Sequence, residues 1–149
     1  MPERHRTVLV VEDNGDDAAL IRVAFRRAGY DHIIQIVQNP GDAICYLKGD
    51  RPYDDRQKFP MPDLVLLDHE MPGDGWEVLQ WLRRQPGLFA LPVLILSGSE
   101  NPAHQKRAAG AGATAYYIKP PDLRGFVKII KTINETWLFS SPGGDVGSP

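Results

Sequence analysis

Short runs of hydrophobic residues alternate along the chain with longer amphipathic stretches. The short runs are rich in β-branched residues and contain few polar ones, which is the pattern of strands buried on both faces. They predict strands at Thr7–Val11, His32–Val37, Leu64–Asp68, Leu91–Ser97 and Thr114–Ile118. Apolar residues recur at helical spacing in the stretches between and after them. These stretches predict helices at Asp16–Ala28, Pro40–Lys48, Asp74–Gln85, Pro102–Gly110 and Leu123–Leu138.

The alternation of strands and helices predicts an α/β fold of the doubly wound (βα)5 type. Such a fold has a parallel five-stranded sheet, right-handed crossovers, and helices on both faces. In the flavodoxin-like strand order 2-1-3-4-5, the first and third strands are neighbours, and ligands bind outside the carboxyl ends of the strands. Residues that directly follow the strands are therefore the first candidates for function.

Residues 50–62, with the sequence DRPYDDRQKFPMP, are polar and punctuated by prolines, so we expect an exposed loop. This loop is longer than most connections between a helix and a strand, which makes it a candidate insertion for contact with a partner. We expect one domain at residues 7–139. An N-terminal tail at 1–6 and a flexible C-terminal tail at 140–149 flank it.

Composition narrows the class of protein. The chain has 149 residues and a formal net charge of −2, so it offers no basic field for nucleic acid. No apolar run approaches the ~20 residues that span a bilayer, and no secretory signal precedes the first strand. The single cysteine, Cys45, excludes an internal disulfide and fits a reducing compartment. We therefore expect a cytoplasmic protein that contacts neither nucleic acid nor membranes directly.

Charged and hydroxyl side chains stand at the carboxyl ends of four of the predicted strands, either as the last residue or directly after it, namely Glu12 and Asp13, Asp68, Ser97 and Lys119. Three carboxylates in one crevice repel one another unless cations compensate their charge. They sum to −3, and the lysine contributes +1, so a divalent cation would balance the remainder. Oxygen ligands favour Mg²⁺, with Mn²⁺ as the other candidate, and no histidine or cysteine cluster indicates zinc.

The same crevice is suited to an aspartyl phosphate. Phosphorylation of Asp68 would add about one negative charge to the pocket, because the acyl linkage removes one charge and the phosphoryl group brings about two. Hydroxyl and backbone N–H donors are then needed, and Ser97 with the amides of Gly98 and Ser99 could supply them.

Four motifs occur in order at the predicted strand ends, and together they match a known family. They are VVED (Val10–Asp13), LLDHEMPGDG (Leu66–Gly75), VLILSGS (Val93–Ser99) and AYYIKP (Ala115–Pro120). Over about residues 6–139 the chain resembles the receiver domains of two-component response regulators. The long loop at 50–62 and the ending INETWL (Ile133–Leu138) resemble the single-domain regulators that pair with bacterial and cyanobacterial phytochrome histidine kinases.

The resemblance implies that Asp68 accepts a phosphoryl group from the phosphohistidine of a sensor histidine kinase, of which a bacteriophytochrome is one kind. It further implies that Asp13, Asp68 and the backbone carbonyl of Glu70 ligate Mg²⁺, with Glu12 acting through water. Lys119 would pair with the phosphoryl group, and its bond to Pro120 is often cis in the family.

The resemblance also implies a conformational switch. Ser97 would move to the phosphate and free space into which Tyr116 turns, remodelling the surface of the fourth helix, fifth strand and fifth helix. Glu70 and Ser99, which flank the acceptor, would tune dephosphorylation. The expected activity is that of a phosphoacceptor with slow autodephosphorylation and not of an enzyme.

Output would come through protein contacts, dimerisation or onward phosphotransfer as a phosphorelay shuttle, because no helix-turn-helix or catalytic segment follows residue 139. The broad apolar surface of the last helix, with Ile129 and the Trp137–Phe139 end, is a candidate face for a homodimer or another partner.

Other roles stay open at this stage. Glu12 and Asp13 alone could complement a helix dipole, and Asp68 alone could close an Asx turn. A phosphatase with an aspartyl-phosphate nucleophile is an alternative, although the segment that follows Asp68 lacks the second Asp and the Thr of a D-x-D-x-T motif. A receiver-like scaffold that never carries phosphate is a further alternative, against which the intact acids and Lys119 argue.

Overall fold

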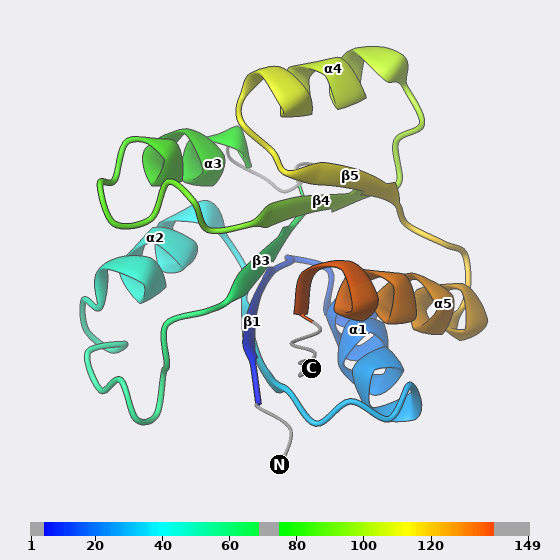
Figure 1. Cartoon of the computed structure of the whole chain (residues 1–149), viewed down its shortest axis with the longest axis horizontal. Coiled ribbons are helices and arrows are strands. Elements are labelled where there is room, and N and C mark those ends of the chain that lie inside the picture. Colours follow the sequence, from blue (N-terminus) through cyan, green and yellow to red (C-terminus); the bar gives the residue numbers. More distant parts are fainter. Residues whose placement is uncertain (1–4, 69–74, 139–149) are drawn as a thin grey trace, which may run out of the picture.

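A computed structural model describes residues 5–68 and 75–138 of the chain. Its centre is a parallel five-stranded sheet with the order β2-β1-β3-β4-β5 (Figure 1). The strands are β1 (Thr7–Val11), β2 (Ile33–Val37), β3 (Leu64–Leu67), β4 (Val93–Ser97) and β5 (Ala115–Ile118). The predicted α/β fold and strand order are confirmed.

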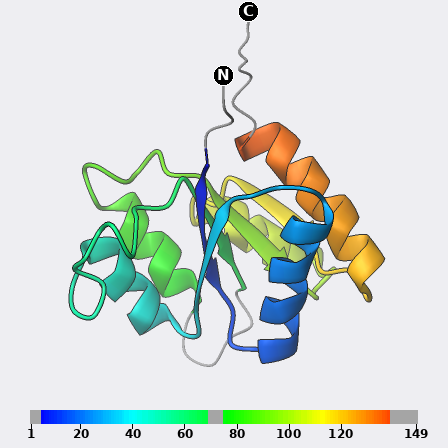
Figure 2. The same cartoon turned by 90° about the horizontal axis from the view of Figure 1, so that it is seen from below.

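Helices cover both faces of the sheet. They are α1 (Gly15–Arg27), α2 (Pro40–Lys48), α3 (Trp76–Arg83), α4 (Pro102–Gly110) and α5 (Leu123–Ile133), the last of which continues into a π-helical turn, η1 (Asn134–Leu138). Figure 2 shows α1 and α5 on one side of the sheet and α2 and α3 on the other. Helix α4 belongs to the side of α2 and α3, because Ala108 packs into the same cluster as they do.

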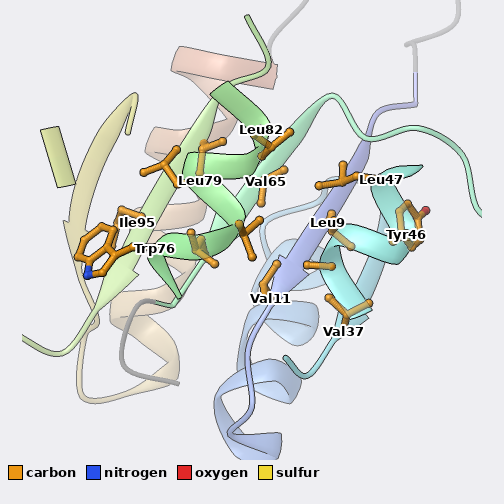
Figure 3. Packing of buried hydrophobic residues seen from close by; sticks show 14 of the residues in the cluster. Leu9, Val11, Val37, Tyr46, Leu47, Val65, Trp76, Leu79, Leu82 and Ile95 are labelled. Atoms are coloured by element: carbon orange, nitrogen blue, oxygen red, sulfur yellow. The ribbon is translucent and has the colours of Figure 1, made fainter. Parts of the chain in front are cut away.

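Every residue of β1, β3 and β4 is buried, which explains why their sequences are continuous apolar runs. Alternate residues point to opposite faces, so Leu9 and Val11 pack against α2 and α3 (Figure 3). Val8 and Val10 pack instead with residues of α1 and α5. The two hydrophobic clusters fix the sheet, and thereby fix where its strand ends lie.

Several helix ends differ from the sequence-based expectation. Helix α1 begins at Gly15, one residue before the predicted start, and its N-cap is Asn14, whose Oδ1 accepts the N–H of Asp17 at 3.0 Å. In α2, Ala43 and Tyr46 are buried with Leu47, whereas Ile44 is only half-buried. That helix ends as expected at Gly49, which takes the left-handed conformation that favours glycine.

The last helix was expected to run unbroken to Leu138 but changes to a π-helical turn at Asn134. Asn134 is buried, and its Oδ1 lies 2.6 Å from Nε2 of His32, the residue just before β2. The only cis peptide bond among the described residues is Arg51–Pro52, so Lys119–Pro120 is not cis. The predicted tails lie largely in residues 1–4 and 139–149, outside the described residues, so the domain boundaries stay predictions.

The long loop at 50–62 is more tightly packed than its polar composition suggests. The rings of Tyr53 and Phe59 pack on Tyr46, with centroids 5.1 and 6.0 Å away. Arg56 donates hydrogen bonds to the carbonyls of Leu47, Tyr53 and Phe59 at 3.1, 3.4 and 3.1 Å. The expectation of an exposed loop therefore holds for its other charged residues but not for Arg56 or for the two aromatic rings. Its role in partner contact stays a prediction.

We expect an Arg56→Met substitution to lower the free energy of unfolding by about 1–3 kcal/mol, because it leaves partly buried carbonyls without donors. Urea denaturation measures this loss. Arg51→Met is the matched control, since Arg51 is an exposed arginine of the same loop. Equal losses in the two variants would show that the hydrogen bonds of Arg56 do not anchor the loop.

Candidate functional site

The candidate site lies at the carboxyl edge of the sheet, where β1 and β3 end side by side. Val11 pairs with Leu67 in the parallel register, so Glu12 and Asp68, which follow them, emerge as neighbours. The backbone N–H of Asp68 donates to the carbonyl of Val11 at 3.0 Å, which continues the ladder by one residue. The strand register thereby brings together acids that are distant in the sequence.

Glu12, Asp13 and Asp68 form an acidic cluster whose ligand oxygens all lie within 4.8 Å of one another. Glu12 and Asp68 are buried, at 2% and 5% exposure, while Asp13 is exposed. Three carboxylates, with one side open to solvent, fit a hard divalent cation such as Mg²⁺ or Mn²⁺, which keeps some of its water ligands. The donor set therefore fits the metal that the sequence predicts.

Lys119 joins this cluster from the end of β5. Its Nζ lies 2.7 Å from Oε1 of Glu12 and 3.2 Å from Oδ2 of Asp68. It also lies 2.8 Å from Oδ2 of Asp17, in the first turn of α1. The backbone N–H of Lys119 donates to the carbonyl of Ser97 at 2.7 Å, which fixes the lysine beside β4.

Asp17 is a site residue that the sequence analysis missed. An acid in the first turn of a helix normally complements the helix dipole, so its identity alone gave no signal of a second partner. The available signal was its place in the first turn of the helix that directly follows Glu12 and Asp13, which keeps it close to the same strand end. With Asp17 the site holds four carboxylates and one ammonium, not the three carboxylates of the earlier charge count.

The pKa values of the site residues follow from burial and from the excess of carboxylates over the single ammonium. Burial raises the pKa of Glu12 from its ordinary 4.5 to about 7; contact with Asp68 adds to the rise, and Lys119 opposes it. Burial alone would lower the pKa of Lys119, but hydrogen bonds to Asp17 and Glu12 and the charge of Asp68 raise it well above its usual value. Lys119 is therefore fully charged at neutral pH.

We expect the affinity for a divalent metal to fall as the pH drops below about 7, approaching about tenfold per pH unit, because the metal must displace the proton of Glu12. Isothermal titration calorimetry in buffers of different ionisation enthalpy measures both the affinity and the released proton. The Glu12→Gln variant should bind more weakly, but with a flat pH profile. A wild-type affinity that is constant from pH 6 to pH 8 would contradict this assignment.

The same pKa shift affects stability with a defined sign. The folded metal-free protein holds the Glu12 proton up to about pH 7, while the unfolded chain loses it near 4.5. Glu12 therefore favours the folded state below pH 4.5, and that contribution is lost as the pH rises to about 7.

The predicted phosphate-contacting residues lie in a connected network beside the acids. Ser97 is fully buried, and its Oγ accepts the N–H of Ser99 at 3.0 Å. The hydroxyl of Tyr116 donates to the carbonyl of Ser99 at 2.8 Å, and Oγ of Ser99 lies 2.6 Å from Nδ1 of His104. After Asp17, His104 is the second residue of the site that the sequence analysis missed. A lone histidine on a helix has no spacing that indicates such a contact.

The two tyrosines of β5 point in different directions. Tyr116 is half-buried on the side of α3 and α4, whereas Tyr117 lies on the opposite side, where its hydroxyl accepts Nε1–H of Trp137 at 3.2 Å. Trp137 and Ile129 are only half-buried against the core of the α1 and α5 side, and Leu138 is buried. Phe139 and the predicted site residue Glu70 lie outside the described residues.

The family model of the response regulator receiver domain matches residues 8–131, which is most of the chain. The chain therefore belongs to this family. Along nearly its whole length it is similar to regulators of the Rcp1 type. The phosphorylated cyanobacterial phytochrome response regulator RcpA is 32% identical, with a TM-score of 0.83, over 93% of this chain and 97% of its own.

Two other relatives extend the comparison. Response regulator Rcp1 of Synechocystis sp., in its Mn²⁺-bound structure, is 28% identical with a TM-score of 0.77 over 97% of this chain and 99% of its own. The probable methanogenesis regulatory protein FilR2 of Methanothrix harundinacea is 34% identical over 91% of this chain and 87% of its own.

Within residues 5–68 and 75–138, no helix is long and apolar enough to span a membrane.

Proposed function

We propose that this receiver domain accepts a phosphoryl group on Asp68 from a sensor histidine kinase and in response changes its α4-β5-α5 surface. The observation that carries the proposal is the environment of Asp68. It is a buried carboxylate at the end of the central strand, within 4.8 Å of two further acids and 3.2 Å from the ammonium of Lys119. This arrangement is suited to phosphoryl transfer, which depends mainly on positioning and on compensation of charge.

In the transfer, a carboxylate oxygen of Asp68 attacks the phosphorus of the phosphohistidine. The new O–P bond forms as the N–P bond breaks, and the leaving imidazole nitrogen takes up a proton. A divalent cation, Mg²⁺ or Mn²⁺, held by Asp13, Asp68 and the carbonyl of Glu70, with Glu12 acting through water, would supply positive charge for the transferred group. Lys119 pairs with a phosphoryl oxygen from the other side.

The network around Ser97 provides a route from phosphorylation to the surface. In our proposal Oγ of Ser97 turns to the phosphoryl group, joined by the N–H groups of Gly98 and Ser99. This breaks the bond in which Ser97 accepts the N–H of Ser99. The carbonyl of Ser99 accepts the hydroxyl of Tyr116, so a movement of Ser99 releases the tyrosine. Tyr116 then turns toward the space that Ser97 leaves. Glu70 and Ser99, beside the acceptor, would set the lifetime of the phosphoryl group.

The relatives support the remaining parts of the proposal. RcpA is described as a phosphorylated phytochrome response regulator, which favours a phytochrome-type kinase as the partner here. Rcp1 binds Mn²⁺, which favours a divalent metal at the acidic cluster. We propose in addition that residues 7–139 form the receiver domain, that the protein acts in the cytoplasm, and that it forms a homodimer through the α4-β5-α5 surface.

Incubation of the wild-type protein with Mg²⁺ and acetyl phosphate tests the proposal. We expect a gain of about 80 Da per chain, the mass of one phosphoryl group, and a shift of oligomeric state on light scattering. Multiple turnover of a small phosphate ester would favour a hydrolase instead. Absence of any adduct would favour a scaffold that carries no phosphate.

A further inference from the structure

Among residues 5–68 and 75–138, Asp17 is the one carboxylate in contact with Lys119 that has no part in the proposed chemistry. We propose that Asp17 is a positioning residue for Lys119: it keeps the ammonium beside the acceptor when a divalent metal takes up the oxygens of Glu12 and Asp68. This inference deepens the proposed function and rests on it.

The contacts of Lys119 carry the first step. Its Nζ lies nearly as close to Asp17, at 2.8 Å, as to Glu12, at 2.7 Å. Its contact with Asp68 is longer, at 3.2 Å. The side chains of Lys119 and Asp17 are 13% and 27% exposed, so solvent screens their pair less than an ion pair on the open surface.

The second step is competition for oxygen atoms. Glu12, Asp13 and Asp68 are the acids whose ligand oxygens converge within 4.8 Å, and Asp17 is not among them. A metal at that cluster would draw the oxygens of Glu12 and Asp68 away from Lys119 and would repel its ammonium. Asp17 is not part of the metal cluster, so it can still pair with Lys119 when the metal is bound.

The position of Asp17 is fixed by the start of α1. Its backbone N–H is capped by Oδ1 of Asn14 at 3.0 Å, which orients the first turn of the helix. Its carboxylate accepts a hydrogen bond from Nζ of Lys119, 102 residues further along the chain. An acid placed only for the helix dipole needs no such partner.

A simpler reading is that this ion pair only ties α1 to β5, or that Asp17 acts on the metal through space. A double-mutant cycle separates the proposal from the through-space reading, because it removes any effect of Asp17 that does not pass through Lys119, and the check of folding addresses the purely structural reading. The cycle consists of wild type, Asp17→Asn, Lys119→Met and the double variant. Its readout is the dissociation constant for Mn²⁺ from calorimetry, with folding checked by circular dichroism.

We expect Asp17→Asn to weaken Mn²⁺ binding more in the wild-type background than in the Lys119→Met background, by a further factor of about three or more. In the wild type, loss of Asp17 leaves Lys119 to compete fully for Glu12 and Asp68, and this competition cannot occur without the lysine. Asp17→Glu, which keeps the charge, should bind Mn²⁺ within about twofold of wild type. Equal effects of Asp17→Asn in both backgrounds would overturn the inference.

Asp16→Asn is the matched control, since it removes one exposed acid from the same helical turn. It should show no coupling to Lys119, and coupling as large as that of Asp17 would also overturn the inference. The Mn²⁺ titration needs no phosphoryl donor. Failure of the wild type to form an adduct would therefore overturn the proposed function, while the cycle separately decides the role of Asp17.

Discussion

An Asp68→Asn variant will take up no phosphoryl group under conditions in which the wild-type protein gains about 80 Da. The carboxamide is neutral and is a far weaker nucleophile than a carboxylate, so no acyl phosphate forms. The substitution preserves the size of a side chain that is only 5% exposed, so the fold should be kept. Intact-mass spectrometry after incubation with Mg²⁺ and acetyl phosphate measures the difference.

Asp16→Asn provides the control for this experiment, because it removes a carboxylate from an exposed position nearby. We expect that variant to gain the same mass as wild type. An Asp68→Asn protein that is modified to the wild-type extent would show that another residue is the acceptor.

A Lys119→Met variant should show the largest loss of stability. It leaves two buried carboxylates, Glu12 and Asp68, without the ammonium that lies 2.7 and 3.2 Å from them. Removing one partner of a buried ion pair typically costs about 3–5 kcal/mol. We expect a loss of this size at pH 8 without divalent metal, measured by urea denaturation.

The loss in Lys119→Met should depend on pH and on metal in defined directions. Protonation of Glu12, whose pKa is about 7 even with Lys119 present, removes one of the two charges, so the loss should be smaller at pH 6. Saturating Mg²⁺ should recover much of the stability at pH 8, because it supplies the missing positive charge. Lys128→Met, at an exposed position of α5, is the control and should change little. A loss that is the same at both pH values and unaffected by Mg²⁺ would contradict this account of the site.

The sequence predicted the sheet and its functional edge because both depend on local patterns. Buried parallel strands give continuous apolar runs, and the register of β1 with β3 then places Glu12 beside Asp68. The end of β5 delivers Lys119 to the same edge, as expected.

The missed features depend on contacts between distant segments, which periodicity cannot reveal. The pairing of Asp17 with Lys119 spans 102 residues, and so does the contact of His32 with Asn134 at the turn from α5 into η1. Arg56 likewise looked like one more charge in a polar loop, although it anchors that loop to the end of α2. In each case the polar residue and its partner are close only in the folded chain.

The central claim is that Asp68 is the phosphoacceptor, and the most direct test is to locate the phosphoryl group in the wild-type protein. Borohydride reduces an aspartyl phosphate to homoserine and leaves an unmodified aspartate intact. Tandem mass spectrometry of the reduced protein after treatment with Mg²⁺ and acetyl phosphate should find homoserine at position 68 and at no other aspartate. Homoserine at position 13 or 17, or an adduct that resists borohydride because it sits on a serine or histidine, would contradict the account.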